Sequence, residues 1–242
     1  MKRFAPLLAF SLLAGCATTP VGFDNPSLKA VRSILQQGQK TDAIFKTGKP
    51  FAFVLLDDND PGRNKKICDA YQGLTTPDLA ALNPNNKVVP TYWPVKLSGL
   101  SQDQQNNLPC STMLANYDHQ RAMQIANIFD LPSASSAYIM AVDGAGKTFY
   151  INIDNGSKKQ LKQVMWAWYK TASLNSEQDG IELKEWWRSA AEDLCGKDFV
   201  VEAAKAFLPG WAGFAVGIVL DKGKCKLETP NRAPVPPATV TA

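Results

Sequence analysis

A continuous apolar run constrains the fold of this chain more than any other feature. Residues 51–56 (FAFVLL) lie between a Gly-Lys-Pro segment and the turn-forming residues 57–62. The run has the length of a strand, and its apolar residues do not alternate with polar ones. Continuous apolarity is typical of a strand covered on both faces, as in sheets that are flanked by helices. The run therefore predicts an α/β fold, with α+β as the alternative.

Helical and strand patterns surround this run in alternation. The hairpin prediction rests on two apolar stretches that flank a glycine-rich turn, and the helix predictions rest on apolar residues at helical spacing. The patterns before residue 83 predict three helices: one over 28–37 with Leu28, Val31, Ile34 and Leu35 on one face, one around Cys68 with Ile67, Ala70, Tyr71 and Leu74 inward, and a short one over 76–82. An edge strand or loop is predicted over 88–97 and a loop over 99–107. The remaining patterns predict a helix over 118–129, strands over 138–142 and 148–153, and a helix over 157–171.

This order of elements resembles the thioredoxin-like fold over residues 45–172. The resemblance is one of topology and lengths, and it implies a three-layer domain over 28–172. Cys68 stands alone where a redox thioredoxin has a C-x-x-C motif at the start of the helix. Pro132 stands six residues before Tyr138, whereas the family keeps a cis-proline directly before the hairpin strand. These two departures predict that the redox chemistry of the family is absent.

The C-terminal part predicts a second, smaller unit. Residues 176–228 hold a helical pattern over 176–194 with Gly196 as its C-terminal cap, and a strand pattern over 214–220. Residues 199–206 fit a helix by their alanines and a strand by their first residues. We expect a small α+β unit here, followed by a disordered proline-rich tail over 229–242.

The first sixteen residues predict export and a lipid anchor. Lys2 and Arg3 precede an apolar stretch that is shorter than the ~20 residues a membrane span needs. The segment 13–16 (LAGC) resembles the lipobox of bacterial lipoproteins, which implies removal of the signal peptide 1–15 and attachment of diacylglycerol to Cys16. Further acylation, as by palmitate, would make the anchoring stable. The alternative is an ordinary secreted protein cut near Ala17.

The residue after the lipidated cysteine also carries information in this family. Asp at that position tends to retain a lipoprotein at the inner membrane, and here it is Ala17. The resemblance therefore implies the outer membrane, facing the periplasm or the exterior. Residues 16–27 form the predicted lipidated tether, whose last eleven residues reach at most about 40 Å.

Four further cysteines predict two disulfides in an oxidising compartment. Cys68, Cys110, Cys195 and Cys225 allow three pairings. We favour Cys68–Cys110 and Cys195–Cys225 because each closes a local loop, which would stabilise the fold by roughly 4 kcal/mol in the loop-entropy estimate. The rival interpretation is a metal or redox site. It is disfavoured because there is no C-x-x-C pair and because His119, the single histidine, lies far in sequence from three of the four thiols.

The net charge disfavours nucleic acid as a partner. The chain has 26 basic and 22 acidic side chains, and 45% of its residues are hydrophobic. Removal of Lys2 and Arg3 with the signal peptide leaves 24 against 22, or a net charge of +2. The basic residues do not form one block, so we expect a globular protein without nucleic-acid binding.

Three acidic residues directly after the strand 51–56 form the candidate ligand site. Asp57, Asp58 and Asp60 would stand at its carboxyl end, where open α/β sheets bind ligands. The segment begins like a calcium loop, but the fifth and twelfth positions, which need oxygen ligands, are Pro61 and Cys68. We therefore expect turn residues that bond their own backbone.

Three other patterns have structural explanations that we prefer. Residues 144–148 (GAGKT) resemble the end of a phosphate-binding loop, but Ala141 replaces the first glycine and a strand follows, which indicates a hairpin turn. His119 with Asp118 and Ser111 could be drawn as a base and nucleophile, but we expect a solvated histidine at a helix start. Four tryptophans are expected in packing rather than in a ligand platform: Trp166, Trp168, Trp186 and Trp187.

The sequence thus predicts an envelope protein without a catalytic residue, a cofactor or a metal. We expect a lipid-anchored binding or scaffold module for another envelope protein or for the cell wall. One alternative is a periplasmic thiol oxidoreductase or redox chaperone that acts through Cys68. The other is a metal-assisted hydrolase that uses the cluster Asp57–Asp60.

Overall fold

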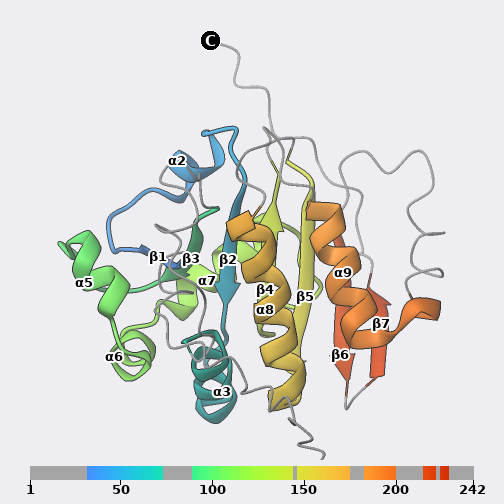
Figure 1. Cartoon of the computed structure of the whole chain (residues 1–242). Coiled ribbons are helices and arrows are strands. Elements are labelled where there is room, and N and C mark those ends of the chain that lie inside the picture. Colours follow the sequence, from blue (N-terminus) through green and yellow to red (C-terminus); the bar gives the residue numbers. More distant parts are fainter. Residues whose placement is uncertain are drawn as a thin grey trace, which may run out of the picture.

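The computed structural model describes residues 32–72, 89–143, 146–174, 183–199, 215–221 and 224–228. They form one seven-stranded mixed sheet with helices on both faces (Figure 1). The strands are β1 (Arg32–Leu35), β2 (Phe51–Leu55), β3 (Thr91–Pro94), β4 (Tyr138–Val142), β5 (Thr148–Asn155), β6 (Ala215–Asp221) and β7 (Lys224–Glu228). The described helices are α2 (Thr41–Phe45), α3 (Pro61–Gln72), α5 (Gln102–Asn107), α6 (Cys110–Ala115), α7 (His119–Ile128), α8 (Lys158–Leu174) and α9 (Leu183–Cys195).

Strand β2 occupies the interior of the sheet. The strand order is β1-β3-β2-β4-β5-β6-β7, and β2 pairs with β3 in parallel and with β4 antiparallel. All five residues of β2 are buried, as its continuous apolarity predicts. Helices α3, α8 and α9 cover the face of the sheet that is turned to the viewer in Figure 1, and α7 lies behind it. The predicted mixed α/β architecture is confirmed.

Aromatic side chains fill the core on both faces of the sheet. On the α7 face, the rings of Phe45, Phe51 and Phe129 contact one another with centroids 5.2–6.4 Å apart. On the opposite face, the Trp168 indole of α8 donates a hydrogen bond of 2.8 Å to the Thr91 hydroxyl of β3. Buried aromatic rings contribute large apolar areas, and this indole N–H finds the partner that burial requires.

The helix predicted over 28–37 is wrong for its described part. Residues 32–35 form strand β1, which pairs in parallel with β3 from Arg32↔Thr91 to Leu35↔Pro94. Ile34 and Leu35 are 2% and 1% exposed. The same apolar residues that fit one face of a helix serve a strand here, because pairing with β3 supplies hydrogen bonds and burial that no local pattern reveals.

The described part of the segment 88–97 contains an interior strand rather than the predicted edge strand or loop. Its residues 91–94 form β3, which lies between β1 and β2. The two prolines stand at its limits, where they cost no ladder donor: Pro90 O accepts from Ala52 N (2.9 Å), and after Pro94 the Val95 N–H donates to Leu35 O (3.0 Å).

The loop predicted over 99–107 is also wrong, since residues 102–107 form α5. Ser101 caps this helix: its hydroxyl accepts from Gln104 N, and the Gln104 side chain accepts from Ser101 N. This reciprocal capping box starts a helix in a segment without an apolar face.

Other predictions for this half of the chain are confirmed. Asp118 caps α7 by accepting a hydrogen bond of 3.1 Å from Arg121 N. The hairpin pairs β4 and β5 from Tyr138↔Asn152 to Val142↔Thr148. Some predictions lie outside the described residues: Cys16 and its tether, Leu74, the helix over 76–82, the start of the helix over 176–194, residues 200–206 and the tail 229–242.

The C-terminal strands continue the same sheet. Strand β6 pairs in parallel with β5, and β7 pairs antiparallel with β6. Gly217 of β6 lies directly under the Tyr150 ring of β5, and any side chain there would overlap that ring. Gly196 follows α9 with a φ of +87°, as expected of a C-terminal cap. The division of the chain into two units stays a prediction.

Candidate functional site

The acidic cluster at the carboxyl end of β2 is engaged in local contacts. Asp57 is 5% exposed, and its carboxylate accepts a hydrogen bond of 2.8 Å from Asn59 N. Asp60 is exposed and caps α3 by accepting from Arg63 N at 2.8 Å. Asp58 is exposed. Asp57 and Asp60 thus bond the nearby backbone, which is the turn role expected of them.

Arg63 gives Asp57 a second, long-range role. Its guanidinium forms an ion pair with Asp57 and another, at 2.6 Å, with Asp154 at the end of β5. The three side chains are only 14%, 4% and 20% exposed. Asp154 also accepts a hydrogen bond of 2.8 Å from Ala137 N at the start of β4. This arrangement joins three strands and α3 at the position of the candidate ligand site.

The cluster does not gather a set of metal ligands. Among the described residues, no three His, Cys, Asp or Glu side chains lie close enough to hold a metal ion.

None of the helices in the described ranges combines the length and the apolar character that a membrane span requires.

The four cysteines form two pairs at disulfide distance, with the pairing that the sequence favours. Cys68 of α3 and Cys110 of α6 have Cα atoms 5.9 Å apart, and Cys195 of α9 and Cys225 of β7 have Cα atoms 5.5 Å apart. Cys68 is 0% and Cys110 is 9% exposed, whereas the second pair is half-buried. Burial therefore shields the Cys68 sulfur from thiols in solution.

His119 and Tyr117 complete the end of β2. The Tyr117 hydroxyl donates to Val54 O (2.7 Å) and accepts from Leu56 N (3.0 Å), where β3 no longer pairs with this strand. The His119 Nδ1 lies 3.3 Å from Leu56 O, and its ring packs on Tyr117. The histidine is half-buried at this backbone position rather than fully solvated as expected, and Ser111 is exposed on α6.

Three of the four tryptophans are fully enclosed. Trp168, Trp186 and Trp187 are 0–1% exposed, and the Trp168 and Trp186 rings meet edge to face at 4.9 Å. Trp166 is half-buried against the core. These residues pack α8 and α9 onto the sheet, as the structural interpretation predicts.

A second polar cluster, which the sequence did not indicate, lies across β4, β5 and β7. The Tyr138 and Tyr150 rings meet edge to face at 5.6 Å, and Tyr150 lies beside Glu228. Burial raises the pKa of Glu228, and a hydrogen bond with Tyr150 partly offsets this rise. Burial also raises the pKa of Tyr138, to about 12. The pairing register of the strands brings these residues together, so no local sequence motif predicts the cluster.

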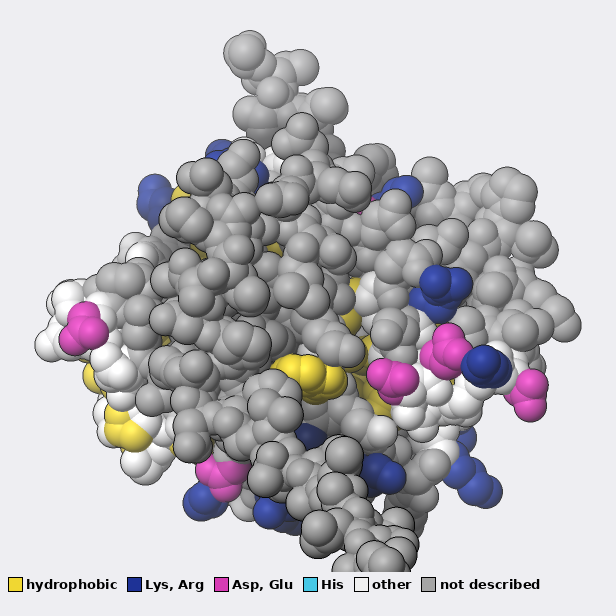
Figure 2. Space-filling model, in the orientation of Figure 1, with side chains coloured by type: hydrophobic (Ala, Val, Ile, Leu, Met, Phe, Trp, Pro, Cys, Tyr) yellow, Lys and Arg dark blue, Asp and Glu magenta, His cyan; other side chains and the backbone are white. Residues whose placement is uncertain are grey.

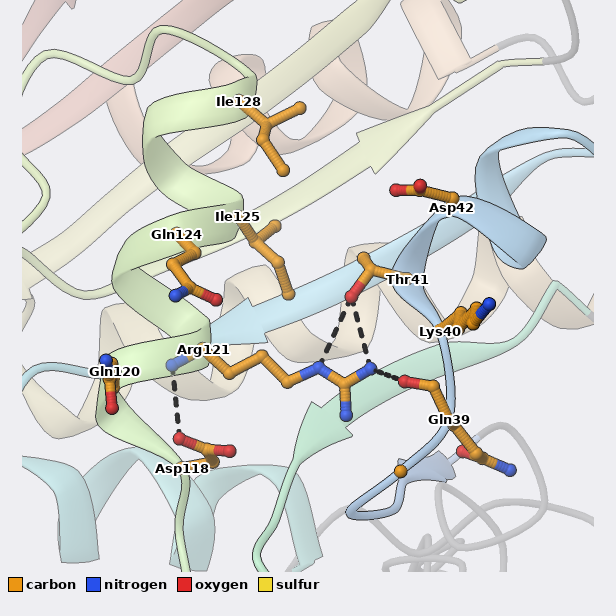
Figure 3. A pocket seen from close by; sticks show the side chains of 11 residues that line it. Gln39, Lys40, Thr41, Asp42, Asp118, Gln120, Arg121, Gln124, Ile125 and Ile128 are labelled. Atoms are coloured by element: carbon orange, nitrogen blue, oxygen red, sulfur yellow. Dashed lines mark hydrogen bonds between the residues drawn. The ribbon is translucent and has the colours of Figure 1, made fainter.

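An open groove of about 500 Å³ lies between α7 and the chain that follows β1 (Figure 3). Arg121 forms its floor and crosses from α7 to the opposite wall. Its guanidinium donates to Gln36 O (2.9 Å), to Gln39 O and to the Thr41 hydroxyl (3.1 Å). These bonds fix the two walls relative to each other, because a guanidinium presents its donors in a rigid fork.

The groove has an apolar end and a polar remainder. Ile128, at one end, is 57% exposed, and Asp118 lies at the other end (Figure 3). Amide side chains line both walls, with Gln39 on one and Gln120 and Gln124 on the other. Such a surface offers hydrogen-bond donors and acceptors beside an apolar contact, which suits recognition of a polypeptide.

Comparison with protein-family models, curated proteins and solved structures found no significant match. The groove was missed in the sequence because its walls are 80 residues apart along the chain, as the Arg121–Thr41 contact shows. One local signal existed: Ile128 is apolar but lies outside the stripe formed by Ala122, Ile125 and Ala126 on α7.

Proposed function

We propose that this protein is a lipid-anchored envelope protein that binds a polypeptide segment of another envelope protein in the groove between α2 and α7. The anchor rests on the LAGC segment that ends at Cys16. The observation that supports the binding role is the groove itself. Arg121 joins its two walls, and Ile128 is exposed at its apolar end.

The amide lining favours a polypeptide over other partners. Gln120 and Gln124 each carry both a donor and an acceptor, as an extended peptide backbone requires, whereas the Gln39 Oε1 already accepts from Gln36 N at 2.9 Å. The charged groups at the walls, Lys40 and Asp42, have opposite signs, so the groove does not select a strongly charged ligand. Ile128, which is 57% exposed, adds an apolar contact beside these polar groups.

Contacts at the other candidate sites weigh against both enzymatic alternatives. Thiol exchange needs access to a sulfur atom, and Cys68 is 0% exposed. A metal-assisted hydrolase needs free carboxylates, and Asp57 is paired with Arg63. We retain the binding role as the proposal.

We also infer a thioredoxin-like unit formed by β1–β5 with α3, α7 and α8. Two features support this inference: β2 lies between a parallel and an antiparallel neighbour, and helices cover both faces. Cys68 lies in the middle of α3 (Pro61–Gln72) rather than at its start, so the inference concerns the fold and not redox chemistry.

The anchor is tested by Cys16→Ser in the native host. We expect the variant to lose incorporation of radiolabelled palmitate and to retain its leader, so that it migrates as the longer precursor. An acylated variant, or one that matures at the wild-type size, would refute the lipid anchor.

The groove is tested by photocrosslinking in intact cells. A photoreactive side chain at position 124 should give one adduct of defined mass, and the same group at Asn107 on α5 should not. Ile128→Asp should abolish the adduct, whereas Met123→Asp, which changes another exposed apolar residue of α7 outside the groove, should retain it. Equal adducts in both variants would refute the site.

A further inference from the structure

Exposed lysines gather at one end of the molecule. Figure 2 shows dark blue side chains along the lower side of the view, over the starts of α3 and α8 and the β6–β7 hairpin. We call this set the lysine belt. Its members are Lys65, Lys66, Lys158, Lys159, Lys162 and Lys224, all of them exposed.

The fold brings these lysines to the same end. Helix α3 packs beside α8, which carries three of them in its first two turns. Asn155, at the end of β5, pairs with Asp221, and Asp221 pairs with Lys224, so the hairpin lies next to the start of α8. Residues from three separate stretches of sequence thus form one basic surface.

The start of α8 conflicts with local helix electrostatics. The helix is capped by Ser157, whose hydroxyl accepts from Gln160 N (3.3 Å) while Gln160 accepts from Ser157 N (3.0 Å). The first turn contains no acidic residue, and Lys158 and Lys159 lie there instead. Positive charge at a helix N-terminus is unfavourable. Violations of a local rule occur where another requirement, usually functional, outweighs it.

Acidic residues offset part of the charge on the α3 side of the belt and on its hairpin side, where Glu192 and Asp193 are exposed on α9 just before the Cys195–Cys225 pair. Lys65 forms an exposed ion pair of 2.6 Å with Asp69. Asp58 and Asp60 are exposed just before α3. The three lysines of α8 therefore make the more strongly basic part.

We infer that the lysine belt lies against anionic phospholipid headgroups of the membrane that holds the lipid anchor. The predicted tether, residues 16–27, reaches at most about 40 Å, which is comparable to the expected diameter of a body of this size. A tether of that length leaves the orientation of the body open. Attraction between the lysines and anionic lipid then selects the face that meets the membrane, as for other basic segments beside a lipid anchor.

This inference rests on the proposed anchor, and its test is independent of acylation. The mature chain, residues 16–242 with Cys16→Ser, is mixed with vesicles of phosphatidylglycerol and phosphatidylcholine, and binding is measured by co-sedimentation. We expect binding to vesicles that contain phosphatidylglycerol, weak binding to pure phosphatidylcholine, and loss of binding near 1 M salt, where screening lengths fall to about 3 Å.

The decisive variant is Lys158→Gln/Lys159→Gln/Lys162→Gln. At the usual contribution of a lysine near an anionic surface, the loss of three should lower the partition coefficient on the order of 100-fold. The matched control is Lys46→Gln/Lys49→Gln/Lys147→Gln, which removes the same charge from exposed positions at the opposite end of β2 and β4. It should retain most of the binding. Neither variant should have a lower thermal midpoint than the wild type, and the α8 variant should have a slightly higher one, because it removes positive charge from a helix N-terminus.

Three results would overturn the inference: no binding of the parent chain to anionic vesicles, wild-type binding by the α8 variant, or equal losses in both variants. The first would also be the outcome if the belt served an acidic protein instead. If the protein is lipidated but its mature chain does not bind anionic vesicles, only the proposed role of the lysine belt is refuted. A chain that binds these vesicles but is never acylated refutes the anchor alone.

Discussion

Several buried polar groups in this protein have hydrogen-bond partners that are remote in the chain. The Tyr117 hydroxyl bridges Val54 and Leu56, and the Thr91 hydroxyl accepts from the Trp168 indole. A buried polar group without a partner costs about 1–3 kcal/mol, so each of these contacts stabilises the arrangement of the elements that it joins. Arg63, held between Asp57 and Asp154, is the charged counterpart.

Replacement of Arg63 by methionine should be strongly destabilising. The change leaves two carboxylates, 4% and 20% exposed, without their cation. Removal of one partner from a buried ion pair costs about 3–5 kcal/mol, and the partial exposure of Asp154 places the expected loss near 3 kcal/mol. Urea denaturation measures it. The control Lys65→Met breaks an exposed pair and should cost less than about 1 kcal/mol; similar losses in both variants would contradict the buried role of Arg63.

Glu228 should make stability depend on pH. Its pKa is raised in the folded chain by burial, so the fold favours the protonated carboxyl. That contribution to stability is complete below the ordinary pKa of 4.5 and is lost as the pH rises through the higher pKa of the folded state. Glu228→Gln should therefore be more stable than the wild type at pH 7. Its stability should also decrease less than that of the wild type as the pH rises above 4.5.

Urea midpoints from pH 4 to pH 8 test this expectation. Glu192→Gln, which removes the same charge from an exposed position on α9, should leave the slope unchanged. Parallel curves for the wild type and Glu228→Gln would show that Glu228 contributes nothing to it.

At the level of the elements, local patterns predicted a helix or strand correctly where its apolar residues are buried. Strand β2, helix α7 and the β4–β5 hairpin form as predicted, because their apolar residues face the core in the period of the element itself. Strand β1 and helix α5 differ from prediction. The former depends on pairing with β3, and the latter depends on a capping box at Ser101.

The contact between β5 and β6 gives a prediction at this scale. Gly217→Ala should cost about 2–3 kcal/mol, because the added methyl group would overlap the Tyr150 ring. In a Tyr150→Leu background the ring is gone and the same change should cost much less. A double-mutant cycle by denaturation measures this coupling, and additive losses would contradict the overlap.

Across the whole molecule, the two cysteine pairs differ in access. Cys68 and Cys110 join α3 to α6 inside the core, whereas Cys195 and Cys225 join α9 to β7 at half-buried positions. A reductant must reach a sulfur atom in line with the bond, so burial protects the first pair. The two cross-links should therefore open under different conditions.

Mild reduction of the native protein followed by alkylation and mass mapping tests this difference. Cys195 and Cys225 should be labelled first, and Cys68 and Cys110 should react only when urea unfolds the chain. Equal labelling rates, or faster labelling of Cys68, would contradict the protection and would reopen the thiol-exchange alternative.

The sequence by itself determined the properties that depend on neighbouring residues. The α/β class, the start of α7 at Asp118, the hairpin and the favoured cysteine pairing all follow from local period, caps or loop closure. The export and lipidation signals at residues 1–16 are also written locally, and they remain predictions.

Only the tertiary structure decided the position of β3 inside the sheet, the ion pairs of Arg63 and the groove spanned by Arg121. Each of these joins residues that are far apart in the chain. Strand order and register bring such residues together, and they are set by the total burial and hydrogen bonding of the folded chain, which no short stretch of sequence encodes.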